Sequence, residues 1–71
     1  MRTYGRAAGV LNLWLRERAV ASCQLARQTG IDPGTVRRIL SGQQSAISTR
    51  NMLALSKFFG VSLRELMDKL S

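Results

Sequence analysis

The stretch "GIDPGTVRRILSG", residues 30–42, contains the side chains whose chemistry is easiest to define. Arg37 and Arg38 are adjacent, and each guanidinium is a planar, permanently charged group that donates paired hydrogen bonds to phosphates or to acceptor edges. Thr35 and Ser41 add hydroxyl groups, which both donate and accept. If these side chains share one face, that face suits an anionic partner rich in acceptors.

The same stretch carries the signals of a short helix. Asp32 is a preferred N-cap residue, and Pro33 fits the first helical position because its missing N–H would have no helical partner there. Gly42 is expected to end the helix. Val36 and Ile39 then lie on the inner face, so the two arginines and their hydroxyl neighbours lie on the outer face.

A preceding helix, "CQLARQT", is expected to be capped by Ser22 and to end at Gly30. Only the three residues Gly30, Ile31 and Asp32 separate it from the arginine-bearing helix. A link this short, with a glycine that adopts positive φ, makes the second helix cross the first steeply. The second helix then protrudes. Such a helix fits the major groove of B-DNA, where guanidinium groups pair with guanine edges or phosphates.

The rest of the chain predicts further helices and no strands. They are expected over residues 3–18, from Ser48 or Thr49 to the closing Gly60, and from the capping box of Ser62 and Glu65, with Val61 and Leu66 as its staple, to about Leu70. There is no alternating apolar pattern and no internal repeat. We therefore predict one compact, all-α, five-helix domain over residues 1–71.

The charge of the chain supports a polyanionic partner. Eleven Lys and Arg residues against four Asp and Glu residues give a net charge of +7 on 71 residues. Residues 1–50 have eight arginines and two acidic residues, or +6, whereas residues 51–71 have three basic and two acidic residues, or +1. The positive charge is therefore concentrated in the part of the chain that contains the arginine-bearing helix.

Several residue types are too scarce for other functions. The sequence has no histidine and a single cysteine, Cys23, so it offers no imidazole catalysis, no Cys/His zinc site and no internal disulfide. We expect no enzymatic activity, no metal and no cofactor. No stretch reaches the roughly 18 apolar residues of a membrane span, and no secretion signal is evident. A cytoplasmic location follows as an expectation.

Two blocks, "LARQTGIDPGTVRRILSG" and "LALSKFFGVSLREL", resemble the XRE (Cro/repressor-type) helix-turn-helix family, which includes lambdoid phage repressors and Cro proteins. The matching positions are Leu25, Ala26, Gly30, Ile31, Val36 and Ile39 in the first block, and Phe59, Gly60, Val61, Ser62 and Leu66 in the second. The resemblance implies a lambda repressor-like domain of bacterial or phage origin. It also implies a homodimer that binds operator DNA and regulates transcription, most often as a repressor.

The chain departs from the family at three places. Pro33 and Gly34 stand where relatives often have polar residues that contact bases, so that role is expected to move to Thr35, Arg37 and Arg38. Ser22 replaces a glutamine that touches phosphate. Ungapped alignment puts Leu15 and Leu40 at a buried Arg–Glu pair, whereas a one-residue gap would put Arg16 at the arginine position. The candidate DNA contacts are Ser22, Pro33, Gly34, Thr35, Arg37, Arg38, Ser41, Gln43, Gln44 and Arg50.

The last two predicted helices are nearly neutral and rich in apolar residues. We expect a dimer interface there, formed by Leu53, Phe58, Leu63, Met67 and Leu70. Two copies would place their protruding helices in successive major grooves, so the operator should be an inverted repeat. The alternative is an antitoxin-type or other regulatory protein that uses the domain mainly to bind a protein partner. RNA binding is less favoured, because few aromatic side chains remain for base stacking.

Overall fold

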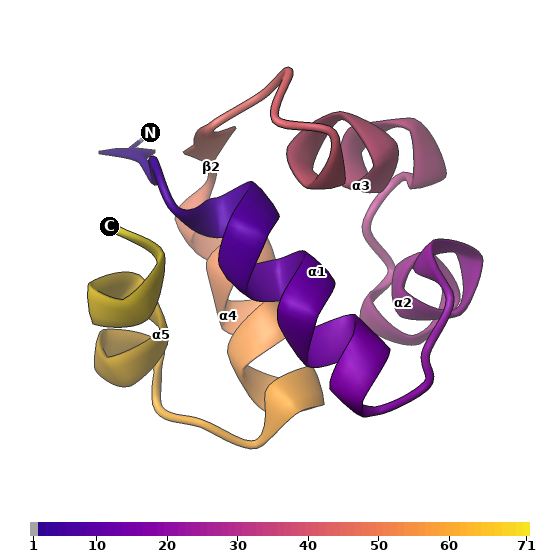
Figure 1. Cartoon of the computed structure of the whole chain (residues 1–71). Coiled ribbons are helices and arrows are strands. Elements are labelled where there is room, and N and C mark those ends of the chain that lie inside the picture. The colour runs from indigo at the N-terminus through magenta and orange to yellow at the C-terminus, as the bar shows by residue number, and fades with distance from the viewer. Residues whose placement is uncertain (1) are drawn as a thin grey trace.

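Five helices joined by short links make up most of residues 2–71, the part of the chain that the computed structural model describes (Figure 1). They are α1 (Ala7–Glu17), α2 (Ser22–Thr29), α3 (Pro33–Leu40), α4 (Thr49–Phe59) and α5 (Leu63–Leu70). In Figure 1, α1 crosses in front of α4, with α2 and α3 on one side and α5 on the other. The prediction of an all-α, five-helix domain is confirmed.

The prediction that the chain forms helices and no strands is wrong at one place. β1 (Arg2–Thr3) pairs antiparallel with β2 (Ala46–Ile47), and α1 begins at Ala7 rather than near residue 3. A ladder of two-residue strands is too short to leave a period-two pattern in the sequence. Only the folded chain brings its first residues beside the link that follows α3.

Backbone hydrogen bonds fix the segment between β1 and α1. The Tyr4 N–H donates to the Ser45 carbonyl oxygen over 2.8 Å, and the Arg6 N–H donates to the Leu70 carbonyl oxygen over 2.8 Å. The Tyr4 side chain is 3% exposed. Tyr4 therefore anchors this segment in the core, while Arg2 and Thr3 are exposed.

Helix ends follow the local signals closely. Ser48 and Ser62 each accept a hydrogen bond from the backbone N–H three residues on, over 3.2 and 3.1 Å. Gly60 takes the left-handed conformation, with φ 71°, after α4. One predicted cap is wrong: Ala21 occupies the N-cap position of α2 in an extended conformation, and Ser22 is the first helical residue. The α2 N-terminus therefore has no side-chain cap.

All five helices contribute to one hydrophobic core. Val36 and Ile39, on the inner face of α3, are each 3% exposed, as predicted. Leu70 corrects another expectation: its side chain is 0% exposed, so it belongs to the core and not to a dimer interface. The backbone of this last turn is also joined to the N-terminal segment, since the Arg6 N–H donates to the Leu70 carbonyl oxygen.

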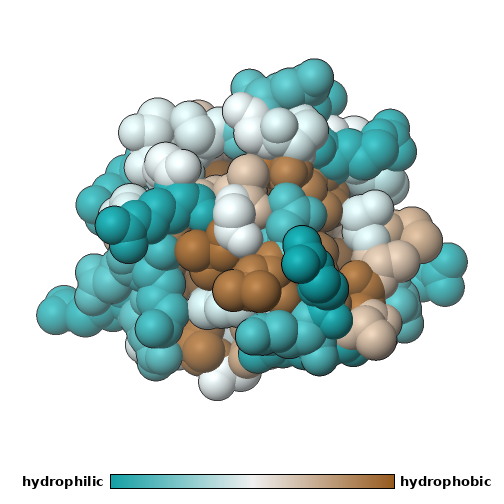
Figure 2. All heavy atoms as spheres, in the orientation of Figure 1, coloured by the Kyte–Doolittle hydropathy of each residue, from teal (hydrophilic) through white to brown (hydrophobic). Residues whose placement is uncertain are grey.

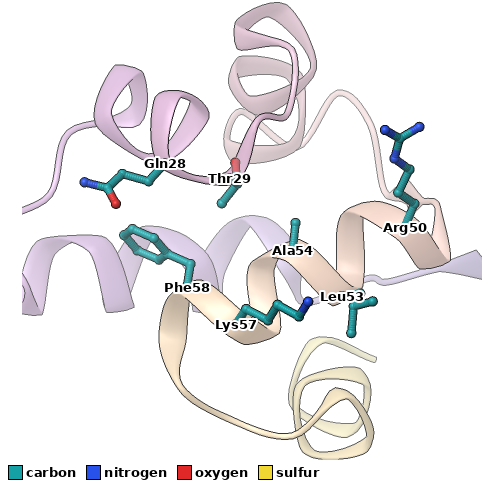
Figure 3. A pocket seen from close by; sticks show the side chains of 7 residues that line it. All are labelled: Gln28, Thr29, Arg50, Leu53, Ala54, Lys57 and Phe58. Atoms are coloured by element: carbon teal, nitrogen blue, oxygen red, sulfur yellow. The ribbon is translucent and has the colours of Figure 1, made fainter.

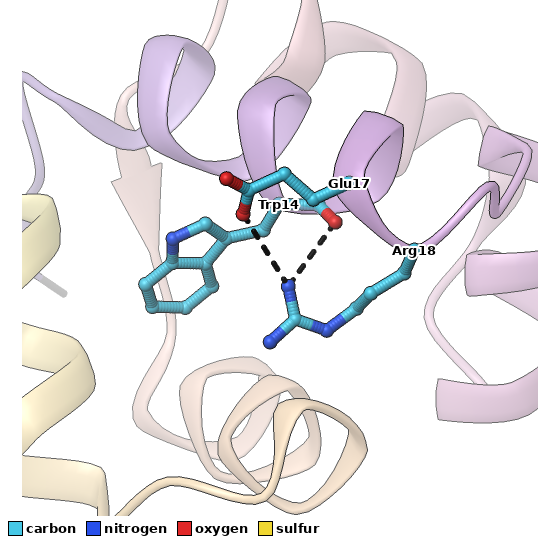
Figure 4. Close-up of polar contacts among 3 residues, drawn as sticks. All are labelled: Trp14, Glu17 and Arg18. Carbon is cyan, nitrogen blue, oxygen red and sulfur yellow. Dashed lines mark hydrogen bonds and ion pairs between the residues drawn. The ribbon is translucent and has the colours of Figure 1, made fainter.

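Arg18 illustrates a positive charge with a structural role. Its guanidinium lies 5.7 Å from the Trp14 ring centroid and 5.1 Å from that of Phe59. Its Nη1 donates to the Trp14 carbonyl oxygen over 3.2 Å and lies 4.0 Å from Glu17 Oε1 (Figure 4). Trp14 and Phe59 themselves meet edge to face at 5.1 Å. Arg18 thus covers the aromatic contact between α1 and α4.

Ala19, just after α1, has φ 54°, and it is the single non-glycine residue with positive φ among residues 2–71. The N–H groups of Ala19 and Val20 donate to the carbonyls of Arg16 and Leu15 over 3.2 and 2.9 Å, which is the Schellman pattern of a helix end. Glycine usually occupies this position, since a Cβ is unfavourable in the left-handed region.

Ala19→Gly should therefore stabilise the domain. Relief of the left-handed strain, about 1–2 kcal/mol, outweighs the additional chain entropy of glycine, for a net gain of about 0.5–1 kcal/mol. Ala54→Gly, within α4, is the matched control and should lose a similar amount. Urea unfolding followed by circular dichroism measures both. A loss of stability in both variants would contradict the argument.

Candidate nucleic-acid interface

The position of α3 is set by its link to α2. Gly30 has φ 76°, and Ile31 is 5% exposed, so the link turns sharply and inserts its central side chain into the core. The Thr29 hydroxyl accepts from the Ile31 N–H over 3.3 Å and donates to the Leu25 carbonyl over 2.7 Å. Asp32 Oδ2 then accepts from the Thr35 N–H over 3.2 Å, as predicted for the α3 cap. In Figure 1, α3 lies at the margin of the molecule.

A side chain of α1 holds the other end of α3. Asn12 Nδ2 donates to the Leu40 carbonyl oxygen over 2.8 Å and to the Ala8 carbonyl oxygen over 2.7 Å. Asn12 is not among the residues predicted from the sequence, because nothing near it in the chain indicates a partner 28 residues away. Leu15 is 5% exposed while Arg16 is exposed, which agrees with the ungapped alignment. Asn12 therefore ties α1 to the C-terminal end of α3.

Arg38 is the most constrained side chain on the outer face of α3. Its Nε donates to Gln44 Oε1 over 3.2 Å, and its Nη2 donates to Thr35 Oγ1 over 3.2 Å. Gln44 is itself fixed, since its Nε2 donates to the Ala46 carbonyl over 2.9 Å and its backbone N–H donates to the Arg38 carbonyl over 3.1 Å. We call Thr35, Arg38 and Gln44 the arginine clamp. It joins three predicted contact residues into one unit.

Gly34 provides the space beneath this clamp. A Cβ at Gly34 would lie 3.0 Å from Asp32 Oδ2 and 3.4 Å from Arg38 Nη1. The first distance is tighter than ordinary packing allows, so a larger residue would displace the carboxylate that caps α3. Glycine at position 34 therefore leaves the Asp32 carboxylate in its capping position.

The other candidate contacts lie around the clamp or away from it. Pro33, Arg37, Ser41 and Gln43 are exposed, on α3 and on the link that follows it. The Ser41 hydroxyl donates to the Arg38 carbonyl over 3.1 Å, so it is partly engaged in ending the helix. Ser22 is half-buried at the start of α2, and Arg50 is exposed in the first turn of α4.

The electrostatics of the described chain are dominated by unpaired positive charge. Within residues 2–71, a single ion pair is formed, between Arg18 and Glu17. Asp32 is the one acidic residue on or next to α3, and its carboxylate faces the helix N-terminus. Neither Arg37 nor Arg38 forms an ion pair within residues 2–71, although the Asp32 carboxylate lies near both guanidinium groups above Gly34, so the positive charge of this face exceeds the negative charge, as a surface for phosphates requires.

The residues predicted for the dimer interface do not line one common surface. Leu53 and Phe58 line a groove of about 610 Å³ between α2 and α4, together with Ala54, Arg50 and Lys57. Gln28 and Thr29 form its α2 side (Figure 3). We call this the α2/α4 groove. Leu63 and Met67 line a separate hollow of about 470 Å³ beside Arg2, Arg64 and Asp68.

The face shown in Figure 2 gathers hydrophobic side chains near its middle, bordered by hydrophilic ones. Within residues 2–71, no helix has both the length and the apolar character needed to cross a membrane. The same residues contain no cluster of His, Cys, Asp and Glu side chains suited to a metal ion.

A helix fixed across its neighbour by a three-residue link, with arginines on its outer face, defines a helix-turn-helix domain. A family model described as helix-turn-helix matches residues 24–66, more than half of the chain. The chain belongs to this family, of the XRE type, which is a family of DNA-binding regulatory domains. No curated protein and no solved structure matches the chain.

Gly34→Ala should fail to give the stability that alanine normally adds to a helix. Glycine to alanine in a helix gains about 0.5–1 kcal/mol, but here the new Cβ pushes Asp32 away from the Thr35 N–H. Gly9→Ala in α1 is the control, since no atom lies within 4 Å of the added Cβ, and it should show the full gain. Thermal unfolding compares the two. Equal gains would show that the Asp32 carboxylate adapts without cost.

Proposed function

We propose that the protein is a transcriptional repressor that binds a specific double-stranded DNA operator by inserting α3 into the major groove. The observation that carries this proposal is the arginine clamp on the exposed face of α3. An arginine that contacts a base must hold its guanidinium in one orientation, and the clamp supplies that orientation before DNA binds.

The geometry of the clamp favours guanine as the base. A guanidinium has five N–H donors, and Arg38 uses one at Nε and one at Nη2 within the protein. Its end, formed by Nη1 and Nη2, keeps free donors that match the O6 and N7 acceptors of guanine. Both polar atoms of the Gln44 amide are engaged in the protein, so we propose that Gln44 positions Arg38 and does not itself contact a base.

The remaining candidate residues suit contacts with the DNA backbone, or they let the start of α3 approach the DNA closely. Arg37, Gln43 and Arg50 are exposed and reach outward, which fits phosphate or sugar contact. At the start of α2, the backbone N–H groups and the Ser22 hydroxyl are available for a phosphate, since no side chain caps that helix. Pro33 and Gly34 add little bulk at the α3 N-terminus, so this end of the helix fits deep in the groove.

Dimerisation through the hollow that contains Leu63 and Met67 would give the protein a second half-site. Both side chains are half-buried, and α5 carries little net charge, so two copies can meet there without strong repulsion. A two-fold axis at this seam predicts an inverted-repeat operator with half-site centres about 10 base pairs apart.

Arg38→Ala tests the DNA-binding proposal on sites first selected from random duplexes. We expect affinity for the selected site to fall by about 1–3 kcal/mol and the preference for guanine at one base pair to disappear. Gln44→Ala should weaken the same preference although it removes no charge.

The control for Arg38→Ala is Arg16→Ala on α1, where the arginine is exposed; it removes the same charge and should leave base preference intact. Competition binding against single-base variants of the site measures all three proteins. If Arg38→Ala weakens specific and random duplexes equally, Arg38 contacts only the DNA backbone.

Met67→Glu tests the dimer. A charge at the seam should leave each subunit folded, by circular dichroism, but lower operator affinity strongly, because a single half-site binds weakly. Leu13→Glu on α1, where the leucine is 48% exposed, is the control and should dimerise normally. Sedimentation of the DNA-bound species measures the stoichiometry. One wild-type subunit per specific site would disprove this dimer.

A further inference from the structure

The proposed DNA contacts leave the α2/α4 groove of about 610 Å³ open, apart from Arg50 at one end. Leu53 is 43% exposed in it, although leucine side chains in so small a domain are needed for the core. The Phe58 ring meets the Phe59 ring edge to face at 5.0 Å, which anchors the apolar wall of the groove.

Two positive charges lie along this apolar wall. Arg50 and Lys57 are seven residues apart on α4, which is about two helical turns or 10 Å, and both are exposed. No acidic residue lines the groove, and neither cation forms an ion pair within residues 2–71. The groove therefore combines exposed apolar side chains with unneutralised positive charge: Arg50 lies at one end, and the Lys57 side chain extends toward Leu53 (Figure 3).

We propose that the α2/α4 groove binds an acidic amphipathic helix of a partner protein. Such a helix would place apolar side chains on Leu53 and Phe58 and carboxylates, two turns apart, on Arg50 and Lys57. A second copy of this chain fits poorly. It carries a charge of +7, and its acidic residues Glu65 and Asp68 are three residues apart with Arg64 and Lys69 beside them.

Occupation of the groove competes with DNA. Arg50 belongs to both surfaces, and a carboxylate paired with it excludes a phosphate from the same guanidinium. The partner therefore weakens operator binding and relieves repression. The competition with DNA rests on the function proposed above, whereas the binding of an acidic helix in the groove does not.

The test uses a displayed library of helix-forming peptides of about 15 residues, long enough for an isolated helix in water, randomised along one face. We expect selection against the protein, without DNA, to enrich peptides with Asp or Glu two turns apart around apolar residues. Lys57→Glu and Leu53→Ser should each weaken the selected peptides about tenfold or more. Lys69→Glu on α5 makes the same charge change outside the groove and should weaken them far less.

Selected peptides that lack acidic residues, or that respond equally to Lys57→Glu and Lys69→Glu, would overturn the proposal. So would a wild-type dimer, seen by sedimentation, that Leu53→Ser dissociates, because the groove would then belong to a second copy. The selected peptide is next added to the protein–DNA complex. A rise in the apparent Kd for DNA supports competition, and no change removes competition while the groove result stands. A failure of specific DNA binding leaves the peptide measurements unaffected.

Discussion

The three-residue link from Gly30 to Asp32 is the constraint on which the rest of the structure depends. The left-handed φ of Gly30 turns the chain, the buried Ile31 anchors the turn in the core, and Asp32 starts the next helix at once. Because no freedom remains between α2 and α3, the inner face of α3 must meet the core, and its outer face must be exposed. A longer link would let α3 lie flat against its neighbours.

Contacts with other parts of the chain hold the side chains on the outer face of α3 in place. The first residues of the described chain pair with Ala46 and Ile47, and the carbonyl of Ala46 fixes the Gln44 amide, which in turn fixes Arg38. Asn12 ties the end of α3 to α1 independently. These contacts come from four separate parts of the chain, so the orientation of one guanidinium reports on the integrity of the whole domain.

The positive charges on different faces of the molecule have different roles. The Arg18 guanidinium lies over the Trp14 and Phe59 rings and stabilises the side of α1 that faces the core. Arg37 and Arg38 remain exposed on α3, while Arg50 stands where α4 meets both the proposed DNA surface and the α2/α4 groove. A small domain with so few acidic residues has little internal means of neutralising these charges, which favours anionic partners at the arginine-bearing faces.

Features that depend on neighbouring residues can be predicted from the amino-acid sequence. The Asp32, Ser48 and Ser62 caps, the glycine helix ends and the inner face of α3 were all predictable, because capping and helical periodicity act within a few residues. The outer face of α3 followed from the same periodicity. The contacts between distant groups depend instead on the packing of the whole chain: the strand pair, the Asn12 contact and the engagement of Arg38 by Gln44. Packing also separates the buried apolar residues of α4 and α5 from the exposed ones. Helical spacing alone does not distinguish Leu53, Met67 and Leu70, because all three are apolar. Whether a neighbouring segment covers each one, as it covers Leu70, depends on packing between parts of the chain far apart in sequence.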